Sequence, residues 1–182
     1  MKTRDIVLIG LFAALTAIGG FINIPISTVS FSLQFLFCAY AGVLLGAKKA
    51  FLSQLLYIGI GLAGVPVFTK GGGIGYILQP SFGFLLGFAI CALIIGLIVE
   101  RMEKPGILNL LAAVFLGLLS TYIAGVLYLY FITNYMAAPG QKIDLLTAIK
   151  WGVAPFFIFD IIKVVVVAAT SLKILPVLRR IN

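Results

Sequence analysis

Long apolar segments recur along the whole chain, separated by short polar turns, and this pattern restricts the possible folds more than any other feature. Most of them approach the ~20 residues that a helix rising about 1.5 Å per residue needs to cross a bilayer. Charged residues make up 10% of the chain, and the mean hydropathy is +1.24. A transmembrane β-barrel would instead show alternating segments of about ten residues. The sequence therefore predicts an all-α integral membrane protein.

We expect six transmembrane helices that form a single domain over residues 1–182. The second and third of these helices are shorter than the roughly 17 residues usually needed to span a membrane. This indicates that they are either poorly tilted or packed inside the bundle. The polar segment after the first helix, Asn23–Ser32, is expected to be a loop. The six expected helices are Ile6–Ile22, Leu33–Gly46, Ala50–Leu62, Phe82–Val99, Ile107–Tyr130 and Leu145–Leu175.

The distribution of Lys and Arg predicts that both termini lie in the cytoplasm. Six spans put both termini on one side, and that side receives nine of the 13 cations. The opposite loops hold three, and Lys163 lies inside the last span. Because cytoplasmic loops are enriched in Lys and Arg, the other loops are expected to face outward. The nine cations are Lys2, Arg4, Lys48, Lys49, Arg101, Lys104, Lys173, Arg179 and Arg180, and the three are Lys70, Lys142 and Lys150.

Several classes of function are not supported by the residues present. The net charge of +8 would suggest nucleic acid in a soluble protein, but here the cations cluster at helix ends, so we predict no nucleic-acid partner. His is absent, and Cys38 and Cys91 lie in apolar segments as small hydrophobic residues, so we predict no metal site and no cofactor. Lys70 lacks the flanking residues of a P-loop, and Leu78 stands where a dinucleotide motif needs glycine, so the chain is not expected to bind ATP by itself.

The glycine-rich segment Gly64–Phe88 breaks the helical pattern between two apolar spans. Irregular backbone at membrane depth persists only where it is covered by protein or lines a cavity, because an unpaired N–H or C=O in hydrocarbon costs several kcal/mol. We interpret this segment as the lip and one wall of a binding site that opens outward. The backbone N–H groups of Gly71–Gly73 could approach a ligand, or these glycines could form a flexible hairpin tip.

Asp160 and Lys163 are the charged residues that lie well inside a span. Each costs on the order of 2.5 to 3.5 kcal/mol at such a position and therefore needs a partner. Their i,i+3 spacing puts them on one helix face, where they can neutralise each other or jointly meet a ligand. We favour the second interpretation, in which they form the floor of an outward-open pocket, over a purely structural ion pair.

Two further sets of residues have alternative interpretations. Four tyrosines could line a pocket or belong to the interfacial aromatic belt, namely Tyr40, Tyr57, Tyr76 and Tyr122. Small residues recur along the first span at spacings of three and four, which allows close packing either inside the bundle or against another subunit. This stripe consists of Gly10, Ala13, Ala14, Ala17 and Gly20. A similar pair, Gly42 and Gly46, is expected to pack internally.

Taken together, these features resemble the BioY family, the biotin-specific substrate-binding subunits (S components) of energy-coupling factor transporters. The run Tyr57–Phe68 with Gly71–Gly75 and Pro80–Phe88 is similar to the long central signature of that family. Phe159-Asp160-Ile161-Ile162-Lys163 resembles its D-x-x-K, Ser32-Leu33-Gln34 its T-L-Q, and Ala13-x-x-x-Ala17 its helix-one alanine motif. The chain departs from the family pattern at Ser81-Phe82 and at Ile158-Phe159.

The resemblance implies a multi-pass protein of a prokaryotic plasma membrane that binds biotin on its outer side. It also implies a transmembrane T component and two cytoplasmic ATPases as partners, with Ala13 and Ala17 in the docking face. Our hypothesis is that Asp160 accepts a hydrogen bond from a ureido N–H of biotin while Lys163 donates to the ureido carbonyl. Further candidates for the site are Gln79 at the ureido ring, Lys70 and Gly73 at the carboxylate, and Tyr40 and Tyr76 as lining residues.

Two other classes of function remain in view at this point. A secondary carrier that transports biotin or another small vitamin by itself would need a chain of titratable groups inside the membrane to relay protons. A single Asp–Lys pair is weak support for such a relay. A membrane-embedded enzyme would need convergent catalytic groups, and the sequence offers no His, exposed Cys or paired carboxylates for that role.

Overall fold

Helices account for most of the chain in the computed structural model, which describes residues 2–25, 29–136 and 142–181. A short antiparallel ribbon, β1 (Asn23–Pro25) and β2 (Ser30–Ser32), follows the first helix, and a 3₁₀ helix, η1 (Ile74–Leu78), lies between α3 and α4. The α-helices are α1 (Thr3–Phe21), α2 (Gln34–Leu45), α3 (Ala47–Leu62), α4 (Phe82–Glu100), α5 (Ile107–Met136), α6 (Leu145–Gly152) and α7 (Phe157–Ile181).

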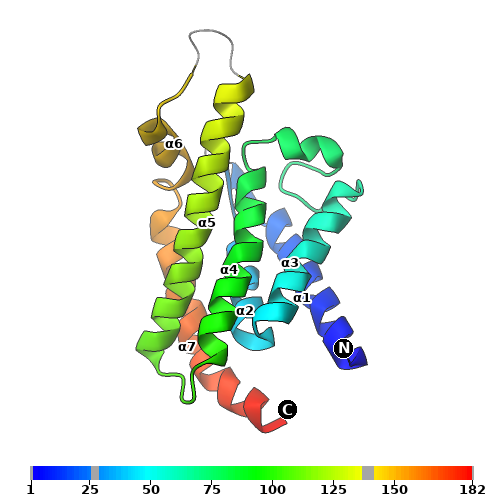
Figure 1. Cartoon of the computed structure of the whole chain (residues 1–182), viewed down its shortest axis with the longest axis vertical. Helices are drawn as coiled ribbons and strands as arrows, with labels where there is room; N and C mark the ends of the chain where they lie inside the picture. Colours follow the sequence, from blue (N-terminus) through cyan, green and yellow to red (C-terminus); the bar gives the residue numbers. More distant parts are fainter. Residues whose placement is uncertain (1, 26–28, 137–141, 182) are drawn as a thin grey trace.

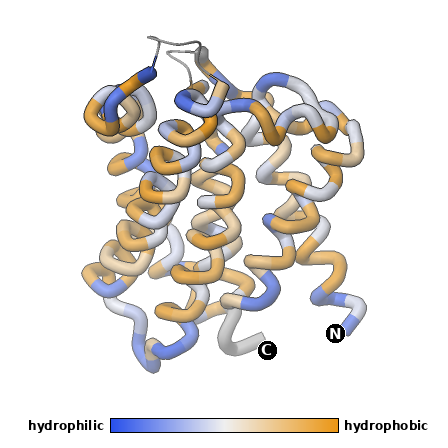
Figure 2. The backbone as a smooth tube through the Cα atoms, turned by 45° about the horizontal axis from the view of Figure 1, so that its top comes forward, coloured by the Kyte–Doolittle hydropathy of each residue, from blue (hydrophilic) through white to orange (hydrophobic). Residues whose placement is uncertain are grey.

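The helices run alternately up and down, so both ends of the chain lie at the same end of the bundle (Figure 1). Within the described residues, α1, α4 and α5 are each long and apolar enough to cross a membrane, and α6 with α7 makes a fourth, broken span. The helices α2 and α3 have 12 and 16 residues, so both are shorter than the roughly 17 residues usually needed to span a membrane, as expected. Hydrophilic residues gather at the two ends of the bundle and apolar residues fill its middle (Figure 2). The expected all-α membrane bundle is confirmed.

The last expected span, Leu145–Leu175, is not one continuous helix. It divides into α6 and α7, which meet at an angle of 53°. Residues 153–156 form the turn between them and include Pro155, which has no N–H and disfavours helical backbone in the residue before it. Asp144 begins α6, since its Oδ1 accepts a hydrogen bond of 3.2 Å from the Thr147 N–H.

The segment Asn23–Ser32, expected to be a loop, contains the ribbon of β1 and β2. The strands pair Asn23 with Ser32 and Ile24 with Phe31. The ribbon is tied to α1 because the Leu33 N–H donates a hydrogen bond of 3.0 Å to the Gly19 carbonyl. This ribbon lies at the end of the bundle opposite the termini (Figure 1).

Helix α4 lies at the centre of the bundle and contacts α2, α3 and α5. Glycines allow this close approach: a Cβ at Gly42 would lie 2.8 Å from Ile95 Cβ, and one at Gly96 would lie 2.3 Å from the Ala47 nitrogen. Gly42 therefore packs internally, as the sequence predicts. Gly46 has φ of 81° and turns the chain between α2 and α3, while Glu100 Oε1 accepts a 2.9 Å hydrogen bond from the Ala47 N–H.

Candidate substrate-binding site

The break between α6 and α7 gives Asp160 a position in the first turn of a helix. The N-terminus of a helix carries partial positive charge and favours an anionic side chain there. Lys163 follows one turn later, and the two residues are 6% and 7% exposed. A continuous helix through 145–175 would have placed Asp160 mid-helix, without that favourable field.

Asp160 and Lys163 are paired with each other and with two neighbouring elements. Lys163 Nζ lies 2.7 Å from Asp160 Oδ1 and also donates a 2.7 Å hydrogen bond to the Ser32 carbonyl of β2. The hydroxyl of Tyr122 in α5 donates to Asp160 Oδ2 at 2.6 Å. The Phe31 ring covers the ammonium group, with 4.1 Å between Nζ and the ring centroid. Two neighbouring elements, β2 and α5, thus hold this pair, and Lys163 donates two of its three ammonium N–H groups to described acceptors.

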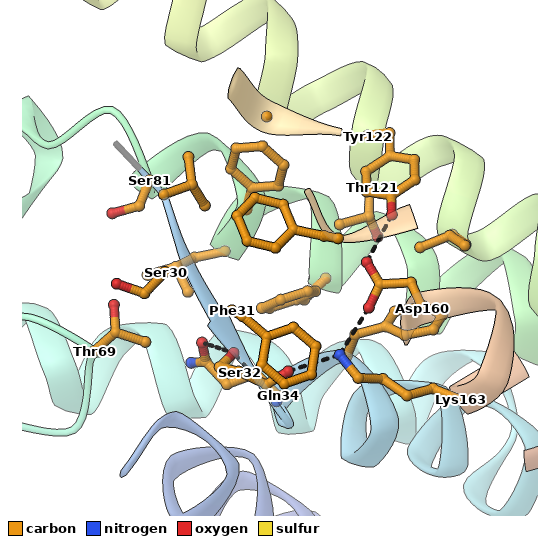
Figure 3. A pocket seen from close by; sticks show the side chains of 18 of the residues that line it. Ser30, Phe31, Ser32, Gln34, Thr69, Ser81, Thr121, Tyr122, Asp160 and Lys163 are labelled. Atoms are coloured by element: carbon orange, nitrogen blue, oxygen red, sulfur yellow. Dashed lines mark hydrogen bonds and ion pairs between the residues drawn. The ribbon is translucent and has the colours of Figure 1, made fainter. Parts of the chain in front are cut away.

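These groups line one end of a cavity that lies between β2, the glycine-rich segment, α4, α5 and α7 (Figure 3). Its volume, measured as the space open to the centre of a water molecule, is about 60 Å³. Its lining residues include both apolar and hydroxyl-bearing side chains: Val29, Ser30, Phe31, Ser32, Gln34, Phe35, Thr69, Tyr76, Ser81, Phe84, Leu85, Phe88, Leu118, Thr121, Tyr122, Gly152, Phe156, Asp160 and Lys163.

Hydroxyl groups from the glycine-rich segment line another part of this cavity. The Tyr76 hydroxyl lies 3.1 Å from both Thr69 Oγ1 and Ser81 Oγ, within hydrogen-bond distance of each. Thr69 and Ser81 lie on the side of the cavity away from Asp160 and Lys163 (Figure 3). The cavity therefore has a charged end, a hydroxyl end and aromatic walls between them, which suits an elongated ligand with polar groups at both ends.

Three of the predicted ligand-binding residues, Asp160, Lys163 and Tyr76, line this cavity. The other four predicted residues do not line it, and their ligand-binding roles stay predictions. Gln79 and Lys70 are exposed, and the Tyr40 hydroxyl lies 2.7 Å from Thr170 Oγ1.

The glycines Gly71 and Gly73 belong to a hairpin between α3 and η1. Their φ angles of 109° and 99° suit glycine, and Phe68 and Gly71 exchange both backbone hydrogen bonds. The Gly73 N–H donates to the Gly61 carbonyl at 2.7 Å, so that particular amide is already used. This geometry agrees with the hairpin-tip interpretation of the glycines.

On α1, the structure separates the small residues of the sequence stripe onto two faces. Ala13 is 3% exposed and packs in the core, and Ala17 is half-buried. Ala14 is exposed, and a Cβ at Gly10 would meet no described atom within 4 Å. The accessible small-residue face of α1 is therefore formed by Gly10, Ala14 and the half-buried Ala17, and the core position of Ala13 favours internal packing for that residue.

Sequence reasoning missed several features of the site. It treated Ser32 as part of a motif, without identifying its carbonyl as the acceptor for Lys163. It gave no binding role to Phe31, Phe156, Thr69 or Ser81. Thr69 and Ser81 lie within the irregular glycine-rich segment, and this position was the available signal for them.

The fold and the site together define a membrane-embedded protein with a small-molecule cavity at one end of a helical bundle. A solved structure described as the S-component for biotin from an ECF-type ABC transporter has the same fold, with a TM-score of 0.81 at 24% identity over 96% of this chain and 94% of that chain. The fold is thus that of an S component.

Sequence comparisons then assign the chain to a family. A probable biotin transporter BioY from Lysinibacillus sphaericus is 52% identical over 73% of this chain and 68% of its own length. The biotin transporter BioY from Thermotoga maritima is 35% identical over 94% of this chain and 95% of its own length. The model of the BioY family matches residues 1–180. This chain belongs to the BioY family.

Proposed function

We propose that this protein binds biotin with high affinity at the outer side of a plasma membrane, as the substrate-binding subunit of an energy-coupling factor transporter. The observation that carries the proposal is the buried Asp160–Lys163 pair at one end of a cavity, in a chain of the BioY family. Such a pair is costly in a membrane and is typical of a site where a ligand completes the hydrogen bonding.

The charged end of the cavity suits the ureido ring of biotin. This ring offers two N–H donors and one carbonyl acceptor. Asp160 accepts a hydrogen bond from a ureido N–H, and Lys163 uses an ammonium N–H to donate to the ureido carbonyl. Hydrogen bonds to charged groups contribute about 1.5 to 3 kcal/mol each, so analogues that lack one partner bind much more weakly.

The remaining parts of biotin match the rest of the cavity. The thiolane ring and the aliphatic chain pack against Phe84, Phe88 and Phe156, and the carboxylate reaches the hydroxyl end at Thr69, next to the cation of Lys70.

Biotin binding is tested on protein purified in detergent, by mass spectrometry of copurified small molecules and by calorimetry with biotin and two analogues. Biotin amide removes the charge of the carboxylate, and diaminobiotin removes the ureido carbonyl. We expect tight binding of biotin, a moderate loss with the amide and a loss of at least about 100-fold with diaminobiotin. Equal affinity for biotin and diaminobiotin would contradict the assignment of Asp160 and Lys163.

We further propose that a T component and two ATPases supply the energy for uptake, and that the T component docks on the face of α1 that contains Gly10, Ala14 and Ala17. Small residues allow close contact between helices in lipid, and a larger side chain at this face separates them. Ala14→Leu is expected to reduce copurification with the T component, whereas Ala112→Leu on the exposed side of α5 is not. Biotin binding by the isolated subunit serves as the folding control for both variants.

Vesicle uptake distinguishes this function from that of a stand-alone carrier. Vesicles that contain this chain alone are compared with vesicles that also contain the T component and the ATPases, with and without ATP. ATP-dependent uptake that requires all subunits supports the proposal. Uptake at the same rate by this chain alone would support a secondary carrier instead.

A further inference from the structure

A chain of hydrogen bonds through the buried side chains of Gln34 and Tyr57 connects the ribbon to the glycine-rich hairpin. Ser32 Oγ donates to Gln34 Oε1 at 2.9 Å, and Gln34 Nε2 donates to the Tyr57 hydroxyl. The Tyr57 hydroxyl in turn donates to the Val67 carbonyl at 3.2 Å. These hydrogen bonds run from β2, through the first residue of α2 and the middle of α3, to the hairpin.

Both ends of this chain belong to segments that line the cavity. At one end, the Ser32 carbonyl accepts the hydrogen bond from Lys163 at the charged end (Figure 3). At the other end, Val67 lies two residues before Thr69, which lines the hydroxyl end. The separation of these two backbone segments sets the space between the two polar ends of the cavity.

The junction around Tyr57 is densely packed and has little room to adjust. Gln34 is 3% exposed and Tyr57 is 1% exposed. The Phe68 ring packs edge-on against the Tyr57 ring, with 5.5 Å between centroids. A Cβ at Gly20 of α1 would lie 3.1 Å from the Val67 carbonyl oxygen and 3.2 Å from Gln34 Nε2. The Tyr57 hydroxyl serves as both donor and acceptor, so its removal leaves two buried polar groups without this partner.

We propose that Tyr57 is a positioning residue of the binding site, which acts through Gln34 on Ser32 and through Val67 on the hairpin. Tyr57 is not among the described residues that line the cavity, so its effect on a ligand is indirect. The ligand-dependent part of this inference rests on the proposed biotin function, whereas the positioning of the two segments can be measured without any ligand.

The first test is hydrogen–deuterium exchange of ligand-free Tyr57→Phe, with Thr16→Val as the matched control. Thr16 Oγ1 also accepts a hydrogen bond from a buried glutamine amide, Gln54 Nε2, at 3.2 Å, but it lies between α1 and α3 and does not join the ribbon to the hairpin. We expect exchange to rise about tenfold in both segments 30–33 and 67–73 of Tyr57→Phe, and in neither segment of Thr16→Val. A rise in one segment alone, or an equal rise in the control, would overturn the proposal.

The second test measures biotin kinetics for the same variants. Tyr57→Phe is expected to speed biotin dissociation about tenfold with little change in the association rate, and Thr16→Val is expected to leave both rates unchanged. Unchanged dissociation from Tyr57→Phe would overturn the role in binding. If the wild-type chain does not bind biotin, the proposed function fails, and the exchange experiment still decides the positioning role.

Gly20→Ala provides a second variant in case Tyr57→Phe does not fold. It removes no hydrogen-bonding group but presses on the Val67 carbonyl and the Gln34 amide. We expect faster exchange in the same two segments, whereas the control Gly59→Ala, whose added Cβ meets no described atom within 4 Å, leaves them unchanged. Equal exchange in the two alanine variants would overturn the proposal.

Discussion

Tyr122 of α5 donates a hydrogen bond of 2.6 Å to Asp160 of α7, and this contact joins two helices at the charged end of the cavity. Asp160 has a second partner in Lys163, which occupies its other carboxylate oxygen. The orientation of the carboxylate is therefore fixed before a ligand arrives. A preorganised acceptor of this kind loses less conformational freedom on binding.

Tyr122→Phe should weaken biotin binding about tenfold. A hydrogen bond to a charged group contributes about 1.5 to 3 kcal/mol, and rearrangement of the groups around Asp160 compensates for part of its loss. Calorimetry on the purified variant measures the loss. Tyr130→Phe, on the same helix but outside the lining of the described cavity, serves as the control and should retain affinity. Wild-type affinity in a folded Tyr122→Phe variant would show that Asp160 is oriented by its other contacts.

Asp160→Asn should reduce biotin affinity by at least about 100-fold, since it keeps the shape but removes the charge that pairs with Lys163 and with the ligand. Asp5→Asn is the matched control, because Asp5 forms an ion pair of 2.8 Å with Lys49 at the other end of the bundle. Unchanged binding by purified Asp160→Asn would mean that the ion pair is structural.

Lys70→Gln and Thr69→Val should weaken the binding of biotin more than that of biotin amide, because both changes affect the end of the cavity assigned to the carboxylate. A difference of about three- to tenfold between the two ligands is expected. Lys142→Gln, another exposed cation expected on the outer side, controls for general electrostatic attraction. Equal losses for the two ligands would exclude a role of these residues at the carboxylate.

Gly96→Ala should destabilise the protein by roughly 1–3 kcal/mol or more, because the added Cβ would overlap the backbone of Ala47. Gly59→Ala should change the stability by less than about 1 kcal/mol, since it adds a methyl group to an exposed helix position. A thiol-reactive dye measures thermal unfolding directly, because Cys38 and Cys91 are both 0% exposed in the folded chain. Equal unfolding temperatures of the two variants would contradict the close approach of α3 and α4.

Cysteine labelling tests the orientation that the Lys and Arg distribution predicts. Lys142→Cys should react with a membrane-impermeant reagent in intact cells, whereas Lys104→Cys should react only after the membrane is permeabilised. Both positions are exposed, and the native cysteines are buried. The opposite labelling pattern would place the cavity on the cytoplasmic side.

The helical bundle and the charged pair could be predicted from the sequence because each depends on a strong local signal. Apolar segments of near-membrane length specify spanning helices, and charges inside such a segment are conspicuous because they are costly. Of the four tyrosines that the sequence offered either as pocket residues or as an interfacial belt, Tyr76 and Tyr122 line the cavity. Sequence reasoning also anticipated that α2 and α3 would be short.

Other features could not be predicted because they depend on small angular differences or on main-chain atoms. Each residue turns a helix by about 100°, so a stripe of small residues is compatible with either face of α1, and the structure buries Ala13 while it exposes Ala14. The last expected span contains Pro155, but a proline alone does not specify a bend of 53°. The Ser32 carbonyl gives no signal in a sequence, since every residue has one.

That main-chain acceptor has a consequence for how members of this family diverge. Because Lys163 is held by the carbonyl of Ser32, neighbouring residues of the ribbon can change their side chains while the cation keeps this acceptor, provided that the backbone of the ribbon keeps its position. Changes of sequence in the ribbon would then alter the shape and polarity of the cavity wall without changing the position of Lys163. Homologues whose ribbons differ in sequence could hold the lysine ammonium group in the same place. A sequence alignment alone would understate this structural similarity.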